Sequence, residues 1–419
     1  MNSVNKSVLR VNKFFKQLKN YTTNKIIIHT DRKNALLESN ISDKRFNKIS
    51  KIDGELFVVK PNIRVESFPY TGGIKEYESS ISLTDDPIIT NIKNNGGIII
   101  ASANMDEAAF GGDTSSSFYG RCINPINKNL SVGGSSGGSA AAISAGIVKY
   151  SIGTDTMGSV RIPASYCGVV GYKPSSLICS NRDLILLSDT YDTIGFMSNK
   201  VNNISNIYVL INFLNYKKSE VNIKNKEIKC IVPTQVLEGE IKPNVIKDFK
   251  FTISKLKKNN LNIVIKNLDF WSPNYHRKAL LKIVEHEGAQ NLNELIDNDK
   301  SQITDNLRKN LLYGKNIKSK EIQTLKFELN KLKNKIELLF EDYDLIITPT
   351  TPQNSFNISD KTPENQANFT CLANIADLPS LCLPFYSKNK QPSSLQLISS
   401  NMNDEFLIEI SSVFEKILQ

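Results

Sequence analysis

The sequence lacks any apolar run of the about 18 residues that a membrane-spanning helix needs, so we expect no transmembrane span. Its six cysteines are widely scattered with no CxxC pair, and it has only three histidines. Disulfide frameworks and zinc sites rely on closely spaced ligands, so we expect reduced thiols and no bound metal. With 40% hydrophobic residues in 419, the chain can bury a large core.

Acidic residues are also missing from the first thirty positions, which carry six lysines and arginines before Asp31. This asymmetry is typical of a mitochondrial targeting segment, and it also fits an ordinary basic N-terminal helix. We therefore set residues 1–25 apart from a single domain over 26–419, and we expect a location in the mitochondrial matrix. The net charge of +10 fits either attraction to nucleic acid or a solvated lysine-rich surface.

Strand-like and helix-like segments alternate along the chain, which favours an α/β fold. The stretch 54–63 indicates a buried strand that stops at Lys60-Pro61, because proline cannot continue a hydrogen-bonded ladder. Ile98–Ala101 indicates a second buried strand, and Ser139–Val148 a buried helix. Leucines and isoleucines spaced three and four apart over 321–340 predict a helix that faces the core, or alternatively a partner helix.

The segment VGGSSGGSAAAISAG over 132–146 combines four glycines and three serines before it becomes a helix. Such a loop can bring hydroxyls and N–H donors around one point, as in a phosphate cradle or a nucleophile site. The phosphate alternative needs a Gly-Lys-Ser/Thr ending, which is absent. GxSxG matches at Ser135 and Ser136 would require a histidine, and His276 and His286 lie in a charged, helix-like stretch.

A lysine can replace histidine as the base when burial lowers its pKa enough to provide a neutral amine. Lys60 is the candidate, because it follows an apolar strand. On this pattern alone, a lysine extending from the strand end into solvent remains the alternative.

Four ordered segments resemble the amidase signature family: VVKPNI, NMDEAAFGG, GGSSGGSAAA and GTDTMGSVRIPASYCGVVGYKP. The spacings agree with it, since 75 positions separate Lys60 from Ser135 and 24 separate Ser135 from Ser159. The resemblance implies the amidase signature fold, a large mixed β-sheet core surrounded by α-helices. It also implies a triad in which Ser159 is the nucleophile that forms an acyl ester, Ser135 bridges through a cis peptide, and Lys60 is the base.

The same resemblance implies an oxyanion hole formed by backbone N–H groups of four consecutive residues, with three further residues in support. Met157 departs from the family's usual glycine, and we expect its side chain to point away from the acyl pocket. The oxyanion-hole residues are Thr156, Met157, Gly158 and Ser159, and the supporting residues are Ser136, Asp155 and Arg161.

Within the family, NMDEAAFGG, YTGGIKEYESSIS and NFTCLANIADLPSLCLP look most similar to the A-type subunits of glutamyl-tRNA(Gln) amidotransferases, in a mitochondrial form. That resemblance implies hydrolysis of glutamine and transfer of ammonia to a tRNA-binding partner subunit of the B type, with a small third subunit possible in the complex. ATP and Mg²⁺ would serve the partner, which activates the mischarged Glu-tRNA(Gln), and no cofactor is expected on this chain.

The expected glutamine pocket departs from the family pattern. Asn310 and Ala367 occupy the positions where the resemblance implies an arginine and an aspartate, so Arg308, Asn310 and Asn368 are the candidate substrate-binding residues. These departures leave two alternatives: a free-standing amidase that acts without partners, and a scaffold subunit with a blocked or disordered oxyanion hole.

Overall fold

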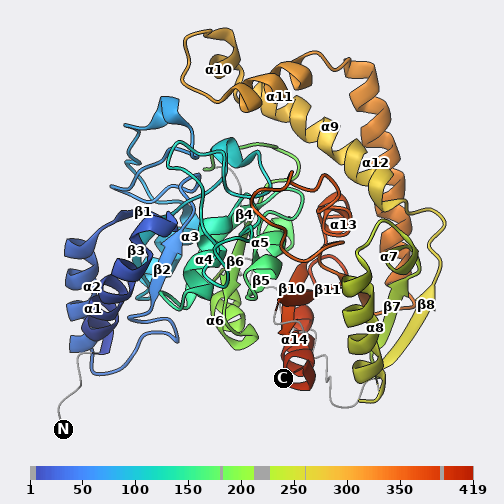
Figure 1. The fold of residues 1–419 in the computed structure, drawn as a ribbon. Coiled ribbons are helices and arrows are strands. Elements are labelled where there is room, and N and C mark those ends of the chain that lie inside the picture. Colours follow the sequence, from blue (N-terminus) through green and yellow to red (C-terminus); the bar gives the residue numbers. More distant parts are fainter. Residues whose placement is uncertain (1–5, 180–182, 212–226, 260, 387–390, 419) are drawn as a thin grey trace.

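The computed structural model describes residues 6–179, 183–211, 227–259, 261–386 and 391–418. Within these ranges one mixed sheet of eleven strands forms the centre, and helices surround it (Figure 1). This arrangement confirms the predicted α/β class and its large mixed sheet. In sheet order the strands are β1 (Ile27–Thr30), β3 (Ile98–Ala103), β2 (Leu56–Val59), β4 (Tyr150–Asp155), β6 (Thr193–Ser198), β5 (Val170–Lys173), β10 (Ser380–Tyr386), β11 (Pro392–Ile398), β9 (Leu345–Pro349), β7 (Lys229–Pro233) and β8 (Asn262–Lys266).

Helices cover the sheet, and α9, α11 and α12 form an arc along one side of the molecule (Figure 1). The helices are α1 (Lys6–Leu18), α2 (Arg32–Lys44), α3 (Pro87–Asn94), α4 (Gly137–Ser144), α5 (Arg161–Tyr166), α6 (Val201–Ile211), α7 (Gln235–Glu238), α8 (Pro243–Lys257), α9 (Pro273–Asn291), α10 (Asn293–Asp297), α11 (Asp305–Lys315), α12 (Ser319–Leu339), α13 (Cys371–Ile375) and α14 (Asp404–Leu418). Short 3₁₀ turns are η1 (Lys19–Asn24), η2 (Lys75–Tyr77), η3 (Glu107–Ala109) and η4 (Ser176–Ile178).

The strand order brings the segments of the serine and lysine motifs to one edge of the sheet. Strand β2 lies between β3 and β4 and runs parallel to both. Neighbouring parallel strands have their carboxyl ends on the same side of the sheet. Lys60, which directly follows β2, therefore lies beside the carboxyl-terminal part of β4. The N–H of Lys60 donates to the Ile152 carbonyl at 3.0 Å, which fixes its backbone to the neighbouring strand.

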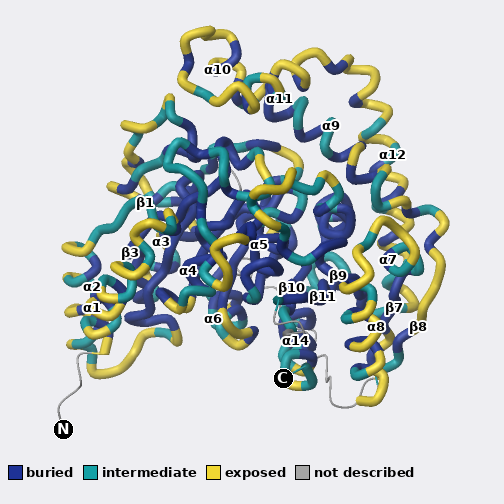
Figure 2. Tube along the Cα trace, viewed as in Figure 1, coloured by how far each residue is buried: buried dark blue, intermediate teal, exposed yellow. Residues whose placement is uncertain are grey.

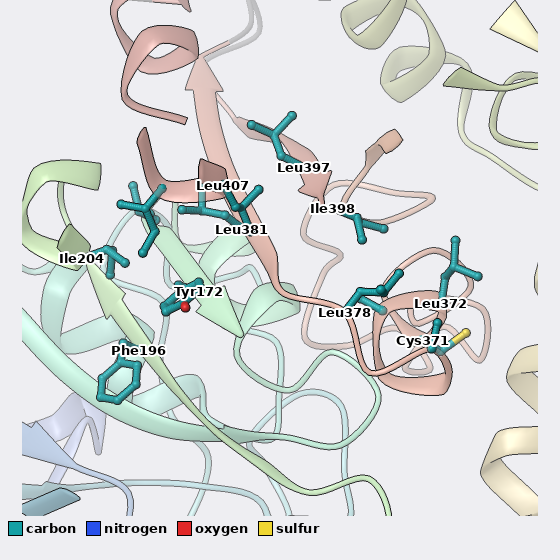
Figure 3. Close-up of a cluster of buried hydrophobic side chains, with 14 of the residues drawn as sticks. Tyr172, Phe196, Ile204, Cys371, Leu372, Leu378, Leu381, Leu397, Ile398 and Leu407 are labelled. Atoms are coloured by element: carbon teal, nitrogen blue, oxygen red, sulfur yellow. The ribbon is translucent and has the colours of Figure 1, made fainter. Parts of the chain in front are cut away.

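Apolar side chains bury the inner strands of the sheet, whereas the outermost strands β1 and β8 are less covered, and the most buried part of the chain lies at the centre of the molecule (Figure 2). In one part of this core, Leu381 of β10 and Leu397 of β11 pack near Leu407 of α14 (Figure 3). The predicted helix over 321–340 is α12, and its buried Leu329 and Ile336 confirm that it faces the core. All six cysteines are buried and free of disulfide bonds, as expected.

Helix α1 packs into the fold, although the sequence set residues 1–25 apart. Val11 and Phe14 are fully buried in an apolar cluster that also includes Ala35 of α2, and Arg10 forms an ion pair with Glu55 at 3.0 Å. Within the described part of that segment, α1 therefore contributes to the core of the domain. Among the described helices, none is both long and apolar enough to cross a membrane.

Replacing Phe14 with alanine should test whether α1 is an integral part of the domain. Removing a fully buried phenyl ring leaves a cavity, so Phe14→Ala should lower the free energy of unfolding by about 3 kcal/mol or more. Leu9 lies on the same helix and is 56% exposed, so Leu9→Ala should change it by less than about 0.5 kcal/mol. Urea unfolding measures both, and equal effects would contradict the packing of α1.

Candidate active site

Lys60 is fully buried and directs its amine at two hydroxyls. Its Nζ lies 2.8 Å from Ser135 Oγ and 2.8 Å from Thr154 Oγ1. Burial lowers the pKa of Lys60 to about 7, even though the carboxylates of Asp192 and Asp106 raise it. Near neutral pH a large fraction of this amine is therefore unprotonated and can accept a proton from Ser135.

The serine loop is held against the segment that follows β3. The Gly134–Ser135 peptide is cis, and the Ser135 carbonyl accepts from the N–H of Asp106 at 3.0 Å. A Cβ atom at Gly134 would lie 2.1 Å from Asp106 Oδ2, so glycine is required for this close approach. Asp106 also accepts from Thr114 N and Ser116 Oγ, at 2.9 and 3.0 Å. Burial, together with the charge of Asp113, raises its pKa to about 6.

Ser136 connects the same loop to the segment after β4. Its hydroxyl donates to the Thr154 carbonyl at 3.1 Å, and its N–H donates to the Ser159 carbonyl at 3.2 Å. The adjacent serines thus have different surroundings: Ser135 contacts the lysine, whereas Ser136 fixes the loop to β4.

Asp155 and Arg161 enclose the turn over 156–159. Asp155 Oδ1 lies 2.8 Å from Arg161 Nη2, and Oδ2 accepts from Arg161 Nε at 3.0 Å and from Val160 N at 3.1 Å. Burial alone would raise the pKa of Asp155, but the charge and hydrogen bonds of Arg161 lower it to about 2. The ionised pair therefore holds both ends of the turn together.

Within the turn, the four N–H groups of residues 156–159 donate to no acceptor among the described residues. Gly158 has φ +133°, and a Cβ there would lie 2.2 Å from Thr370 Oγ1. Met157 lies outside the positive-φ region, so its side chain causes no backbone strain. The turn leaves a run of backbone donors that an anionic oxygen could use.

Ser159 and Met157 line a cavity of about 380 Å³ between this turn, α9, α11 and the segment 362–367. Ser159 is partly exposed, whereas Lys60 and Ser135 are fully buried. Met157 lines this cavity and also packs against the main apolar core, as does Phe110. Other lining residues include Phe110, Leu281, Val284, Arg277, Asn310, Glu364 and Ala367.

The candidate substrate-binding residues separate into one inside and two outside this cavity. Asn310 lines it, as does Ala367. Arg308 does not, because its Nη2 donates to Ser301 Oγ at 2.7 Å and to the Ser301 carbonyl at 3.1 Å. Asn368 lies in a neighbouring pocket, where its Oδ1 accepts from Arg277 Nε at 3.0 Å. Arg308 and Asn368 therefore do not line this cavity, although Asn368 contacts Arg277, which does.

The histidines of the alternative hydrolase motif do not reach the serines. His276 Nδ1 accepts from the N–H of Ser272, and His286 Nδ1 contacts the Gly314 carbonyl.

Two residues at the site were not predicted from the sequence. Thr154 was detectable, since it lies in the GTDTMGSVR segment, whereas Arg277 had no sequence signal because only the fold brings α9 to the cavity.

Comparison with known proteins finds similarity over nearly the whole chain. The Amidase family model matches residues 10–408. The A-type subunit of a glutamyl-tRNA(Gln) amidotransferase from Staphylococcus epidermidis is 28% identical, over 94% of this chain and 90% of its own. The corresponding subunit from Macrococcus caseolyticus is also 28% identical, over 92% of this chain and 88% of its own.

Solved structures share the fold. A crystal structure of an amidase superposes with a TM-score of 0.91 at 22% identity, covering 99% of this chain and 96% of the other. The A-type glutamyl-tRNA(Gln) amidotransferase subunit from Thermotoga maritima has a TM-score of 0.78 at 25% identity, covering 97% of this chain and 90% of the other. The length of the family match, together with the serine and lysine segments of the site, identifies the chain as a member of the amidase family.

Proposed function

We propose that this chain is the glutaminase subunit of a glutamyl-tRNA(Gln) amidotransferase. The observation that carries the proposal is the buried hydrogen bond from Lys60 Nζ to Ser135 Oγ, next to a cavity lined by Ser159. The A-type relatives, 28% identical over 94% of the chain, support this function over other amidase chemistry.

In the proposed reaction, Ser159 Oγ attacks the side-chain amide carbon of glutamine. Its proton passes through Ser135 to the neutral amine of Lys60, and the N–H groups of 156–159 stabilise the oxyanion. The relay then returns a proton to the departing nitrogen, the C–N bond breaks, and ammonia leaves an acyl ester on Ser159. Water attacks this ester by the same relay and releases glutamate.

The ammonia would pass to a partner subunit of the B type, in a complex that can include a small third subunit. The partner would use ATP and Mg²⁺ to activate Glu-tRNA(Gln), and the released ammonia would convert it to Gln-tRNA(Gln). The A-type relatives support this division of labour, in which neither nucleotide nor tRNA chemistry resides on this chain.

A free-standing amidase is the second candidate, favoured by one observation. Asn310 and Ala367 give the cavity wall no charge at the two positions where the family resemblance implies an arginine and an aspartate. The scaffold alternative has less support, since the turn at Met157 is neither strained nor closed off from the cavity.

Location in the mitochondrial matrix rests only on the basic, acid-poor composition of residues 1–25. Cell fractionation with an antibody against the chain should find it with matrix markers. Recovery with cytosolic markers alone would contradict this location and would leave the proposed chemistry unaffected.

Ser159→Ala in the assembled complex should abolish glutamine-dependent formation of Gln-tRNA(Gln), with a loss of more than about 1,000-fold. Transamidation supplied with ammonium chloride should continue, because only the nitrogen source is lost. Lys60→Ala should behave in the same way. Product formation is measured by separating Glu-tRNA from Gln-tRNA.

The chain alone provides the control for this experiment. Glutamine hydrolysis that depends on the partner and Glu-tRNA supports the amidotransferase function. Partner-independent turnover of simple amides, with glutamine ignored, would establish the free-standing amidase instead. Loss of the ammonium-supported reaction in Ser159→Ala would show that Ser159 acts in folding or assembly.

The pH dependence of kcat/KM should report the buried lysine. Lys60 must be neutral to accept a proton and its pKa is lowered to about 7, so activity should rise with pH through about 7 and fall tenfold per unit below it. Circular dichroism at each pH checks that the protein stays folded. An acid limb near the ordinary lysine pKa, or a flat profile between pH 6 and 8, would exclude Lys60 as the base.

A further inference from the structure

Two arginines are almost completely buried near the candidate site, and their surroundings differ. Arg161 is 0% exposed and has its charge neutralised by the bidentate contact with Asp155. Its Nη1 also donates to the Thr370 carbonyl and to Gln396 Oε1, both at 2.7 Å. Arg161 thus has a full set of partners within the protein.

Arg277 of α9 is 5% exposed, and its hydrogen-bond partners among the described residues are neutral. Its Nε donates to Asn368 Oδ1 at 3.0 Å and its Nη2 to Asn274 Oδ1 at 3.2 Å. Within the described ranges no carboxylate forms an ion pair with it, and Nη1 has no acceptor. Burial lowers the pKa of Arg277, whereas Cys371 and the carboxylates of Glu364 and Glu240, which form no ion pair with it, raise the pKa. Guanidinium has five donors in a planar fork, so several remain for an anion.

Arg277 also lines the cavity that contains Ser159. The wall around it is largely apolar, with Leu281 and Val284 from the same helix. The acidic side chain that lines this cavity, Glu364, is exposed and pairs with Lys361 at 2.7 Å. Within the described residues, the cavity therefore combines a buried cation that forms no ion pair with a serine suited to attack an amide. A charge-assisted bond formed there is stronger than one in water, because the solvent is excluded.

We propose that Arg277 binds the carboxylate of the amide substrate and selects amides that carry such a group over neutral ones. This inference rests on the proposed amide hydrolysis at Ser159. It assigns to α9 the cation that the family pattern would put at position 310, where this chain has asparagine. The side-chain oxygens of Asn368 and Asn274 orient the guanidinium of Arg277 but carry no charge. The positive charge of Arg277 is therefore available to the substrate.

The test compares Arg277→Met with the wild type in the co-expressed complex, using glutamine, succinamate and butyramide. Arg277→Met should raise KM for glutamine and succinamate about 10- to 100-fold, with a smaller effect on kcat, since binding to a carboxylate is lost. Turnover of butyramide, which has no carboxylate, should keep its kcat/KM within about twofold. Arg277→Lys should recover part of the loss, because it restores the charge without the fork.

Arg308→Met is the matched control, because this arginine on the neighbouring α11 bonds Ser301 outside the cavity. It should leave the ratio of kcat/KM for glutamine and butyramide unchanged. An equal loss on all three amides in Arg277→Met, or a lower thermal unfolding midpoint with an unchanged ratio, would assign Arg277 a structural role and overturn the proposal.

Two further outcomes separate this inference from the proposed function. Turnover of succinamate that depends on Arg277, with glutamine ignored, would support the carboxylate site and reject the glutaminase. If no amide is turned over, calorimetric titration of glutamine and succinamate into the Ser159→Ala complex decides. If the Ser159→Ala, Arg277→Met double variant binds these amides about 10-fold or more weakly than Ser159→Ala, the result supports the carboxylate site. Equal binding by the two variants, or no binding by either, overturns the proposal.

Discussion

The candidate site depends most on the buried ion pair between Asp155 and Arg161. Asp155 ends β4, and its carboxylate holds the first residues of α5, so the turn between them is closed at both ends. Arg161 extends this connection to the Thr370 carbonyl and to Gln396 of β11. Burying two charges is costly, and here each charge is compensated by several hydrogen bonds. The pair thus holds both ends of the segment that carries the N–H groups of residues 156–159.

The second requirement is a basic amine in a dry environment. In the described part of the chain Lys60 has no direct carboxylate contact, and its hydrogen-bond partners are the hydroxyls of Ser135 and Thr154. A carboxylate in contact would keep the amine protonated, whereas hydroxyl partners allow it to titrate near neutrality. The carboxylates of Asp106 and Asp192 act at longer range and moderate the effect of burial. The fold thus sets the pKa of Lys60 in two ways: it buries the amine, and it keeps the carboxylates of Asp106 and Asp192 out of direct contact with it.

Sequence patterns predicted strands at 54–63 and 98–101, and the resemblance of four contiguous motifs to the amidase signature family brought Lys60, Ser135 and Ser159 into one hypothesis. The substrate wall was less predictable. Arg308 lies two positions from Asn310, which is about 200° around a helix, so it faces another direction. Asn368 adjoins Ala367 and yet points into a different pocket. Arg277 is far in sequence from the lysine and serine motifs, and only the packing of α9 over the cavity reveals it.

The network around Arg161 also has a consequence for synthesis of the protein. Its partners extend to Gln396 on β11, a strand that lies near the carboxyl end of the chain and pairs with β10 and β9. A nascent chain emerges from its N-terminus, so all the nucleophile and base segments leave the ribosome long before β11 does. Until then Arg161 lacks part of its hydrogen-bonding shell and the turn lacks its support. The order of synthesis therefore delays completion of the reactive serine's surroundings until almost the whole domain is available to fold.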